Sequence, residues 1–271
     1  MNTPEIRIIT DCPHSAAFNM AADLYTLNRC ETGPSLVIRL YSWERPSITL
    51  GIMEKPGQTL DIAAIQRDGV SWIKRPTGGR SVLHYEDVTY SCIYSNSVDL
   101  LGNSLMESYR TISNCLMNGL MLSGVKCLPH DSPLDNSLVK RQAKLPCFLA
   151  PNRHEIMVMG KKLVGSAQKR TSRAVLQHGS IPVTRAFRLL PRYLQLTIEE
   201  RSRQEELLEQ KTICIREINP ALLQKDLIGS LVKGFCDTLG LQSIAGSWSV
   251  PEIQAIEAIA GTADFIAKWQ T

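Results

Sequence analysis

The chain lacks both a membrane-spanning segment and an export signal. A transmembrane helix needs about 20 consecutive apolar residues, and polar or charged residues interrupt every apolar run here well before that length. The first fifteen residues, MNTPEIRIITDCPHS, do not place a basic segment before an apolar one, as a secretory signal does. We therefore expect a cytoplasmic protein that does not bind membranes.

Cysteine patterns typical of disulfide frameworks and metal sites are also missing. Eight cysteines are present, but no two of them form a Cys-x-x-Cys pair. In a chain without an export signal such thiols normally stay reduced. Cys12-Pro13-His14 resembles half of a metal site, yet no second ligand pair follows it at the spacing typical of zinc. We expect neither a metal ion nor a bound cofactor.

The apolar periodicity indicates an α+β fold. Of the 271 residues 44% are apolar, which is enough for a buried core. The sequence contains no internal repeat. Short alternating or apolar runs predict strands, and apolar positions about 3.6 residues apart predict helices. The strands are expected at 6–10, 35–43, 48–50, 71–74, 81–94, 155–159, 163–167, 174–176 and 179–183, and the helices at 15–29, 60–67 and 105–123.

The composition changes after residue 185. From there helix-forming residues dominate, and helices are expected at 198–210, 219–239 and 250–269. We expect a core domain at 1–185 and a helical extension at 186–271 that packs on the same domain, with a small separate domain as the alternative for these residues. Residues 131–151 are rich in Pro, Ser, Asn and Asp without periodicity, which predicts a long loop.

Cys147 is the candidate nucleophile of this chain. It follows Pro146 at the end of that loop, whereas Cys92, Cys115 and Cys236 lie in runs that predict buried strands or helices. A thiol attacks efficiently only as thiolate, which a nearby cation favours. Between residues 139 and 173 there are nine Lys or Arg and one acidic residue, Glu155. The segment therefore offers an activating cation and a surface for an acidic partner, although a structural role for Cys147 is equally compatible with the pattern.

A glycine turn separates two expected strands. The sequence runs Arg75-Pro76-Thr77-Gly78-Gly79-Arg80, and paired glycines let backbone amides approach a ligand closely. A tight β-turn explains the same glycines without a ligand. The segment is not a Walker loop, because no Gly-Lys-Ser/Thr follows.

Three histidines are candidate bases, namely His84, His154 and His178. A cysteine–histidine pair of the protease kind is one use for them. None lies in a papain-like context, and a histidine within a strand is more often a packed, hydrogen-bonded residue. Both interpretations stay open from the residues alone.

In combination these motifs resemble the biotin/lipoate protein ligase superfamily, and within it the octanoyltransferase branch of LipM type. The resemblance extends from about residue 11 to residue 183. Four strings carry it: RPTGGRSVLH at 75–84, PCF at 146–148, GKKLVGSAQ at 160–168 and LQHGS at 176–180. Each string is weak alone, but their order and spacing are specific.

The resemblance implies a mixed β-sheet catalytic domain flanked by helices and an acyl-enzyme mechanism. Cys147 would take an octanoyl group from acyl carrier protein and pass it to a lipoyl-domain lysine, for example on the glycine cleavage H protein, and Lys162 would lower the pKa of the thiol. No nucleic acid is expected as a partner. By resemblance the substrate-binding residues are Arg75, Thr77, Gly78, Gly79, Arg80, His84, Gly165, Ser166, Ala167, Gln168, His178 and Gly179.

Related chemistries share this scaffold. An ATP-dependent lipoate ligase usually has three glycines in the turn, where this chain has Arg80 in the third place. A lipoyl or octanoyl amidotransferase between lipoyl domains differs only in motif detail. A non-catalytic module that binds carrier proteins would not need Cys147 and Lys162, and both are present.

Overall fold

A central mixed sheet of six strands organises the molecule. The computed structural model describes residues 5–130, 155–242 and 245–269. Within these residues the strand order of the central sheet is β10-β11-β6-β2-β1-β12. The strands are β1 (Glu5–His14), β2 (Ser35–Trp43), β6 (Asp87–Ser95), β10 (Gly165–Arg170), β11 (Ala174–Pro182) and β12 (Ala245–Gly246). β12, β1 and β2 run parallel, whereas the pairs from β2 to β10 are antiparallel, so the predicted mixed sheet is confirmed.

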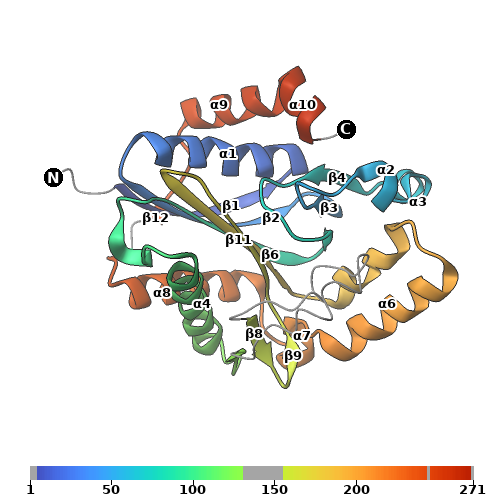
Figure 1. Ribbon diagram of the computed structural model, residues 1–271. Helices are drawn as coiled ribbons and strands as arrows, with labels where there is room; N and C mark the ends of the chain where they lie inside the picture. Colours follow the sequence, from blue (N-terminus) through green and yellow to red (C-terminus); the bar gives the residue numbers. More distant parts are fainter. Residues whose placement is uncertain (1–4, 131–154, 243–244, 270–271) are drawn as a thin grey trace.

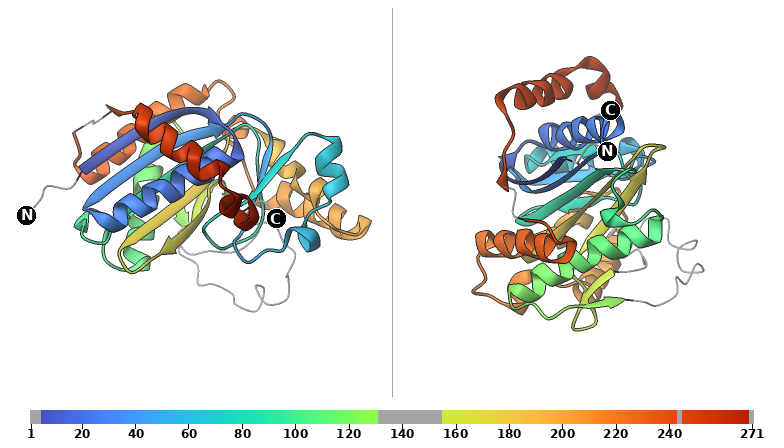
Figure 2. Two further views of the ribbon diagram at one scale, coloured as in Figure 1. Left: turned by 90° about the horizontal axis from the view of Figure 1, so that it is seen from above. Right: turned by 90° about the vertical axis from the view of Figure 1, so that its left-hand side faces the viewer.

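Helices cover both faces of this sheet (Figures 1 and 2). On one face lies α1 (Ala16–Thr32), with α9 (Val250–Gly261) and α10 (Ala263–Trp269) packed outside it. On the other face lie α4 (Leu105–Leu122) and α8 (Gln224–Leu239). None of the helices in the described ranges is sufficiently long and apolar to cross a membrane.

The capping residues of the long helices follow from the sequence. The Ser15 side chain accepts a hydrogen bond from the backbone N–H of Phe18 and begins α1, as predicted. Ser104 and Glu107 form a capping box at the start of α4. These local contacts satisfy amides that have no partner within the helix.

Alternation along the strands distributes side chains between the two faces. In β6, Tyr90, Cys92 and Tyr94 contribute to the main core beneath α4 and α8. Ile93 instead packs on the α1 side with Leu27. Because alternate residues point to opposite faces and both faces are buried, the sequence of such a strand is apolar almost throughout.

A smaller sheet lies beside the central one, with the order β4-β3-β5. Its strands are β3 (Ser47–Leu50), β4 (Ser71–Lys74) and β5 (Val82–His84). The sequence predicted one strand over 81–94, and this is wrong. The chain turns at Tyr85-Glu86, where Glu86 has a left-handed φ of 55°, because β5 pairs with β3 while β6 pairs with β2 in the other sheet.

A third sheet carries one of the predicted catalytic residues. It consists of β7 (Leu128–His130), β8 (Glu155–Val158) and β9 (Lys161–Lys162). The predicted hairpin at Gly160 is present, but its return strand is shorter than the expected 163–167. Leu163 and Val164 leave this sheet for the main core, and the chain continues as β10.

The remaining elements are helical, with one exception. In the C-terminal part, α6 (Ile198–Lys211) and α8 lie close to the helices predicted at 198–210 and 219–239. The helix predicted at 250–269 is divided into α9 and α10, and the 3₁₀ helix η3 (Arg185–Tyr193) and α7 (Ile215–Ile218) were not predicted. The exception is β12, which adds a parallel strand next to β1 and was not predicted. The boundary at residue 185 stays a prediction. The short elements in the first half are α2 (Pro56–Thr59), α3 (Ile62–Arg67) and the 3₁₀ helix η1 (Asp99–Leu101).

Candidate active site

A pocket lies where the central sheet and the β4-β3-β5 sheet meet α1. Seven of the predicted substrate-binding residues line it, namely Arg75, His84, Gly165, Ser166, Ala167, His178 and Gly179. The structure thus brings together residues from three of the four sequence motifs.

The pairing of β10 with β11 creates the floor of this pocket. Ser166 lies opposite Gly179, and Ala167 lies opposite His178. A Cβ atom on Gly179 would lie 2.4 Å from the Gly165 carbonyl oxygen and 2.7 Å from the ring of Tyr90. Only glycine fits at this position, so the close approach of backbone that the motif predicted is present there.

The other predicted substrate-binding residues lie outside the lining. Gly78, Gly79 and Arg80 form the turn between β4 and β5, and the carbonyls of Gly78 and Arg80 each accept a hydrogen bond from Arg75 Nη2 at 2.8 Å. Gln168 lies farther along β10, where its amide donates to Gln177 Oε1 at 3.0 Å. Gly79 has a φ of 89°, which explains the need for glycine in this turn.

Thr77 connects two lining residues from behind the pocket wall. The Arg75 guanidinium donates through Nε to Thr77 Oγ1 at 3.1 Å. The same oxygen lies 2.7 Å from His178 Nε2. The other ring nitrogen of His178, Nδ1, lies 2.9 Å from Asp23 Oδ2. Four buried side chains therefore form a continuous polar chain from α1 to the pocket.

Burial determines how this chain is protonated. It lowers the pKa of His178, although Asp23 opposes the shift by favouring the charged ring. A neutral imidazole carries one proton, and the Asp23 carboxylate can only accept, so that proton lies on Nδ1. Nε2 then accepts the Thr77 hydroxyl proton. Asp23 thus holds His178 as a neutral acceptor at the pocket wall.

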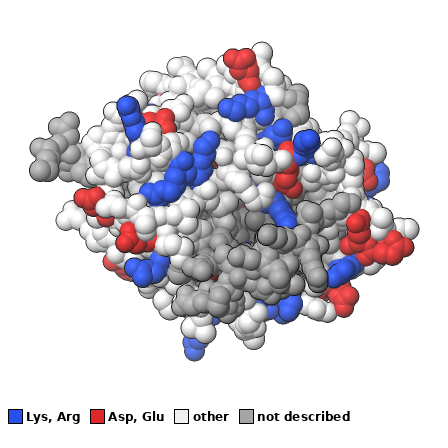
Figure 3. Space-filling view, in the orientation of Figure 1, with Lys and Arg blue, Asp and Glu red and all other residues white. Residues whose placement is uncertain are grey.

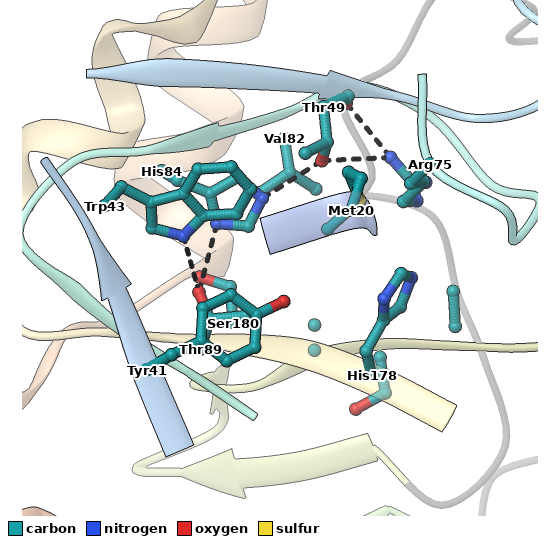
Figure 4. Close-up of a pocket in the computed structure, with 14 residues that line it drawn as sticks. Met20, Tyr41, Trp43, Thr49, Arg75, Val82, His84, Thr89, His178 and Ser180 are labelled. Atoms are coloured by element: carbon teal, nitrogen blue, oxygen red, sulfur yellow. Dashed lines mark hydrogen bonds between the residues drawn. The ribbon is translucent and has the colours of Figure 1, made fainter. Parts of the chain in front are cut away.

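A second polar cluster occupies the opposite end of the pocket (Figure 4). Trp43 stacks on His84 with ring centroids 4.2 Å apart, and its indole N–H donates to Thr89 Oγ1 at 2.8 Å. His84 Nδ1 lies 2.8 Å from Asp87 Oδ2. The hydroxyls of Thr89 and Ser180 donate to this same carboxylate oxygen. Asp87 therefore fixes the orientation of His84.

Tyr41 differs from its polar neighbours in the pocket. Only 1% of its surface is exposed, and its hydroxyl has no hydrogen-bond partner among the described residues. The ring lies between His178 and the Trp43–His84 pair in Figure 4. A buried hydroxyl without a partner is costly, and in the pocket lining this hydroxyl is placed to donate to a bound ligand or a water molecule.

Lys162 is not among the residues that line this pocket. It lies in β9, three residues before Gly165, and its Nζ donates to Glu155 Oε1 at 2.6 Å. Both side chains are more than 90% buried. In the sequence, Glu155 counted only as the single acid in a basic segment, and its ion pair with Lys162 was not predicted. This pair shows that Lys162 is a buried residue instead of a surface cation. Cys147 and His154 lie outside the described residues.

Several lining residues were missed because they belong to ordinary-looking elements. They are Met20, Tyr41, Trp43, Thr49 and Thr89. Val82 and Ser180 also line the pocket and lie within the motif strings at 75–84 and 176–180. For Asp23, one of the two carboxylates behind the wall, a sequence signal exists. Asp23 lies within the apolar run of α1, four residues after the buried Asn19, and an acid on the buried face of a helix requires a polar partner.

Comparison with known proteins assigns the family. The sequence model of the lipoyl protein ligase A/B catalytic domain matches residues 15–236. The chain belongs to this family. The match spans the pocket, both polar clusters and most of the described core, so the predicted superfamily is confirmed.

Relatives within the ligase A/B family refine the assignment. The chain is 35% identical to octanoyltransferase LipM of Kyrpidia tusciae, over 90% of this chain and 91% of the relative. It is 32% identical to octanoyltransferase LipM of Carboxydothermus hydrogenoformans, over 84% and 86% respectively. By this homology the ligase A/B domain described here is an acyltransferase.

The fold is shared with solved structures of the family. One chain of the structure of a bipartite lipoate protein ligase and its E2 lipoyl domain from Thermoplasma acidophilum superimposes with a TM-score of 0.77. The alignment covers 97% of this chain and 96% of that chain at 17% identity. The predicted α+β architecture of the ligase A/B family is therefore confirmed.

Proposed function

We propose that this enzyme transfers an octanoyl group from the phosphopantetheine thioester of acyl carrier protein to a lysine of a lipoyl domain, through a thioester on Cys147. The observation that carries the proposal is the similarity to octanoyltransferase LipM over 90% of the chain. The acceptor would be a lipoyl-domain protein such as the glycine cleavage H protein. The reaction contributes to protein lipoylation.

The lining of the pocket suits an acyl chain. Met20, Val82 and Ala167 provide apolar wall, and the glycine backbone of β10 and β11 leaves room beside them. Polar groups line the rest of the pocket, where a chain of hydrogen bonds runs from His178 to His84 through Thr77, Arg75 and Thr49. An alkyl chain is held by such apolar walls, while polar groups at an end orient a carbonyl.

The proposed chemistry needs no nucleotide. The Cys147 thiolate attacks the octanoyl carbonyl, and the phosphopantetheine thiol leaves. The lysine amine then attacks the new thioester, loses a proton and releases the Cys147 thiolate as the amide forms. Exchange of one thioester for another is nearly isoenergetic, and amide formation is favourable, so the two steps proceed without ATP.

The positive charge of one surface supports acyl carrier protein as the donor of the octanoyl group. Lys and Arg side chains gather without an intervening acid over the β10–β11 hairpin in Figure 3. The turn of this hairpin has the sequence Lys169-Arg170-Thr171-Ser172-Arg173. A basic surface steers an acidic carrier protein and favours its docking.

An acyl-transfer assay with and without ATP tests the proposal. The protein is incubated with octanoyl acyl carrier protein and a lipoyl domain, and the mass of the acceptor is followed. We expect an increase of one octanoyl group without ATP, resistant to hydroxylamine as an amide is. Modification only from free octanoate or lipoate with ATP would instead establish a ligase and overturn the proposal.

Tyr41→Phe should separate a ligand contact from a structural one. Removing a buried hydroxyl without a described partner should leave the thermal midpoint unchanged or raise it. If this hydroxyl donates to the acyl carbonyl, octanoyl transfer should fall about tenfold, the effect of losing about 1.4 kcal/mol of hydrogen bonding. Burial raises the pKa of Tyr41, so the group stays a neutral donor.

Tyr94→Phe is the matched control for this measurement. Tyr94 is equally buried in the central sheet but does not line the pocket. We expect its transfer rate to match that of the wild type. Equal rates for wild type and both variants would show that the Tyr41 hydroxyl does not contact the substrate.

A further inference from the structure

We propose that Asp11, Cys12 and His14 form a binding site for a divalent transition-metal ion, with zinc as the best match. The three ligand atoms lie within 4.8 Å of one another. Cys12 Sγ is 3.3 Å from His14 Nε2, and His14 Nε2 is 3.0 Å from Asp11 Oδ1. Asp11 Oδ1 and Cys12 Sγ are 4.0 Å apart.

These separations match one face of a tetrahedron. With zinc bonds of about 2.3 Å to sulfur, 2.05 Å to nitrogen and 2.1 Å to oxygen, neighbouring ligand atoms lie about 3.4–3.6 Å apart. The separation between each pair of ligand atoms would therefore change by only about 0.4 Å or less on binding. Cys12 is exposed, so solvent reaches the group and a water molecule can supply the fourth ligand.

An irregularity in β1 brings these side chains together. On a regular strand the neighbours Asp11 and Cys12 would point to opposite faces of the sheet. The register between β1 and β2 shifts between Thr10 and Pro13, and pairing resumes with Pro13 opposite Ser42 and His14 opposite Trp43. A bulge of this kind redirects side chains and is often found at functional positions.

Neighbouring side chains hold two of the three ligands in place. Asp11 Oδ2 accepts from Arg39 Nε at 2.8 Å and from Trp248 Nε1 at 2.7 Å, so Oδ1 is directed toward the other ligands. The ring of His14 stacks on Phe18 with centroids 3.9 Å apart. Such outer contacts orient metal ligands before the ion arrives.

The donor set determines the class of ion. A thiolate, an imidazole and a carboxylate suit zinc and related borderline ions, whereas calcium and magnesium require oxygen ligands. Cys12 is the one exposed cysteine among the described residues. No metal ion was predicted from the sequence, because no second pair of ligands follows Cys12 and His14 at the spacing typical of zinc sites. The third ligand, Asp11, is instead the residue next to Cys12, and a search for two spaced pairs does not include it.

Cobalt titration of the full-length protein tests the proposal. Co²⁺ replaces zinc in four-coordinate sites and gives a thiolate-to-cobalt charge-transfer band. We expect this band in the wild type, its loss when Zn²⁺ is added, and its absence in Cys12→Ser. The band should persist in Cys147→Ser, which tests whether Cys147, a thiol outside the described residues, is its source. Absence of the band in the wild type, or its presence in Cys12→Ser, would overturn the site.

Two further variants distinguish a preorganised site from a thiol that binds metal without defined geometry. His14→Asn should weaken Co²⁺ binding at least about tenfold through loss of a ligand, and Trp248→Phe should weaken it about tenfold through loss of an outer contact. Circular dichroism confirms that both variants are folded. Wild-type affinity in both would contradict a role for His14 and for the Asp11–Trp248 contact, and would overturn the proposed site.

Discussion

Cys147→Ser is expected to abolish octanoyl transfer. If Cys147 carries the acyl group, wild-type protein incubated with octanoyl acyl carrier protein should gain the mass of one octanoyl group, and hydroxylamine should remove it. The serine variant should show no such adduct, and its transfer rate should fall by a factor on the order of 10³ or more, because a serine hydroxyl without a dedicated base is a far weaker nucleophile than a thiolate. Intact-protein mass spectrometry and the transfer assay measure the two effects.

Cys236→Ser serves as the matched control for this experiment. Cys236 lies on α8, outside the pocket, and burial raises the pKa of its thiol. It should therefore acquire no acyl group, and its replacement should leave the adduct intact. Peptide mapping locates the adduct among the eight cysteines of the chain. An adduct on another cysteine, or none in the wild type, would contradict the acyl-enzyme mechanism.

Local signals in the sequence predicted the longer helices and most strands of the described structure, but not the short helices η1, η3 and α7. Ser15, Ser104 and Gly240 mark helix ends that capping chemistry identifies without tertiary information. What local signals did not predict is the exchange of the chain between sheets. The break at Glu86 and the short β9 depend on which distant strand offers a partner, and β12 consists of two residues that have no strand pattern of their own.

In the candidate site too, some residues were identified from the sequence and others depend on the tertiary fold. The family resemblance carried by the glycine and histidine motifs identified Arg75, His84 and His178 as substrate-binding residues, and all three line the pocket. Tyr41 and Trp43 read as core residues of a strand, and their position in the pocket depends on how the two sheets meet. Asp23 is separated from His178 by 155 positions, so their hydrogen bond is a product of the tertiary fold.

The buried pair of Lys162 and Glu155 raises a question that the sequence did not. A lysine proposed to activate a thiol is here also part of the core, 6% exposed, with its ammonium 2.6 Å from a carboxylate. Loss of activity on mutation could therefore arise from loss of folding. Replacing one member of such a pair is strongly destabilising, whereas replacing both by apolar residues is often neutral.

Lys162→Ala is accordingly expected to lower the free energy of unfolding by about 3–5 kcal/mol, because it takes the ammonium away from the buried Glu155 carboxylate. The double variant Glu155→Leu/Lys162→Met should recover most of this loss, to within about 1 kcal/mol of the wild type. Chemical denaturation of the three proteins measures these differences. A Lys162→Ala variant as stable as the wild type would contradict the structural part of this prediction.

The double variant, with its stability recovered, shows separately whether Lys162 contributes to catalysis. If Lys162 favours the Cys147 thiolate, removing its positive charge raises the pKa of the thiol. The pH profile for alkylation of Cys147 should then shift upward in the double variant, and octanoyl transfer at neutral pH should fall about 100-fold even though the protein is folded. An unchanged profile with normal transfer would assign Lys162 to the core alone, because stability has been restored independently of the charge.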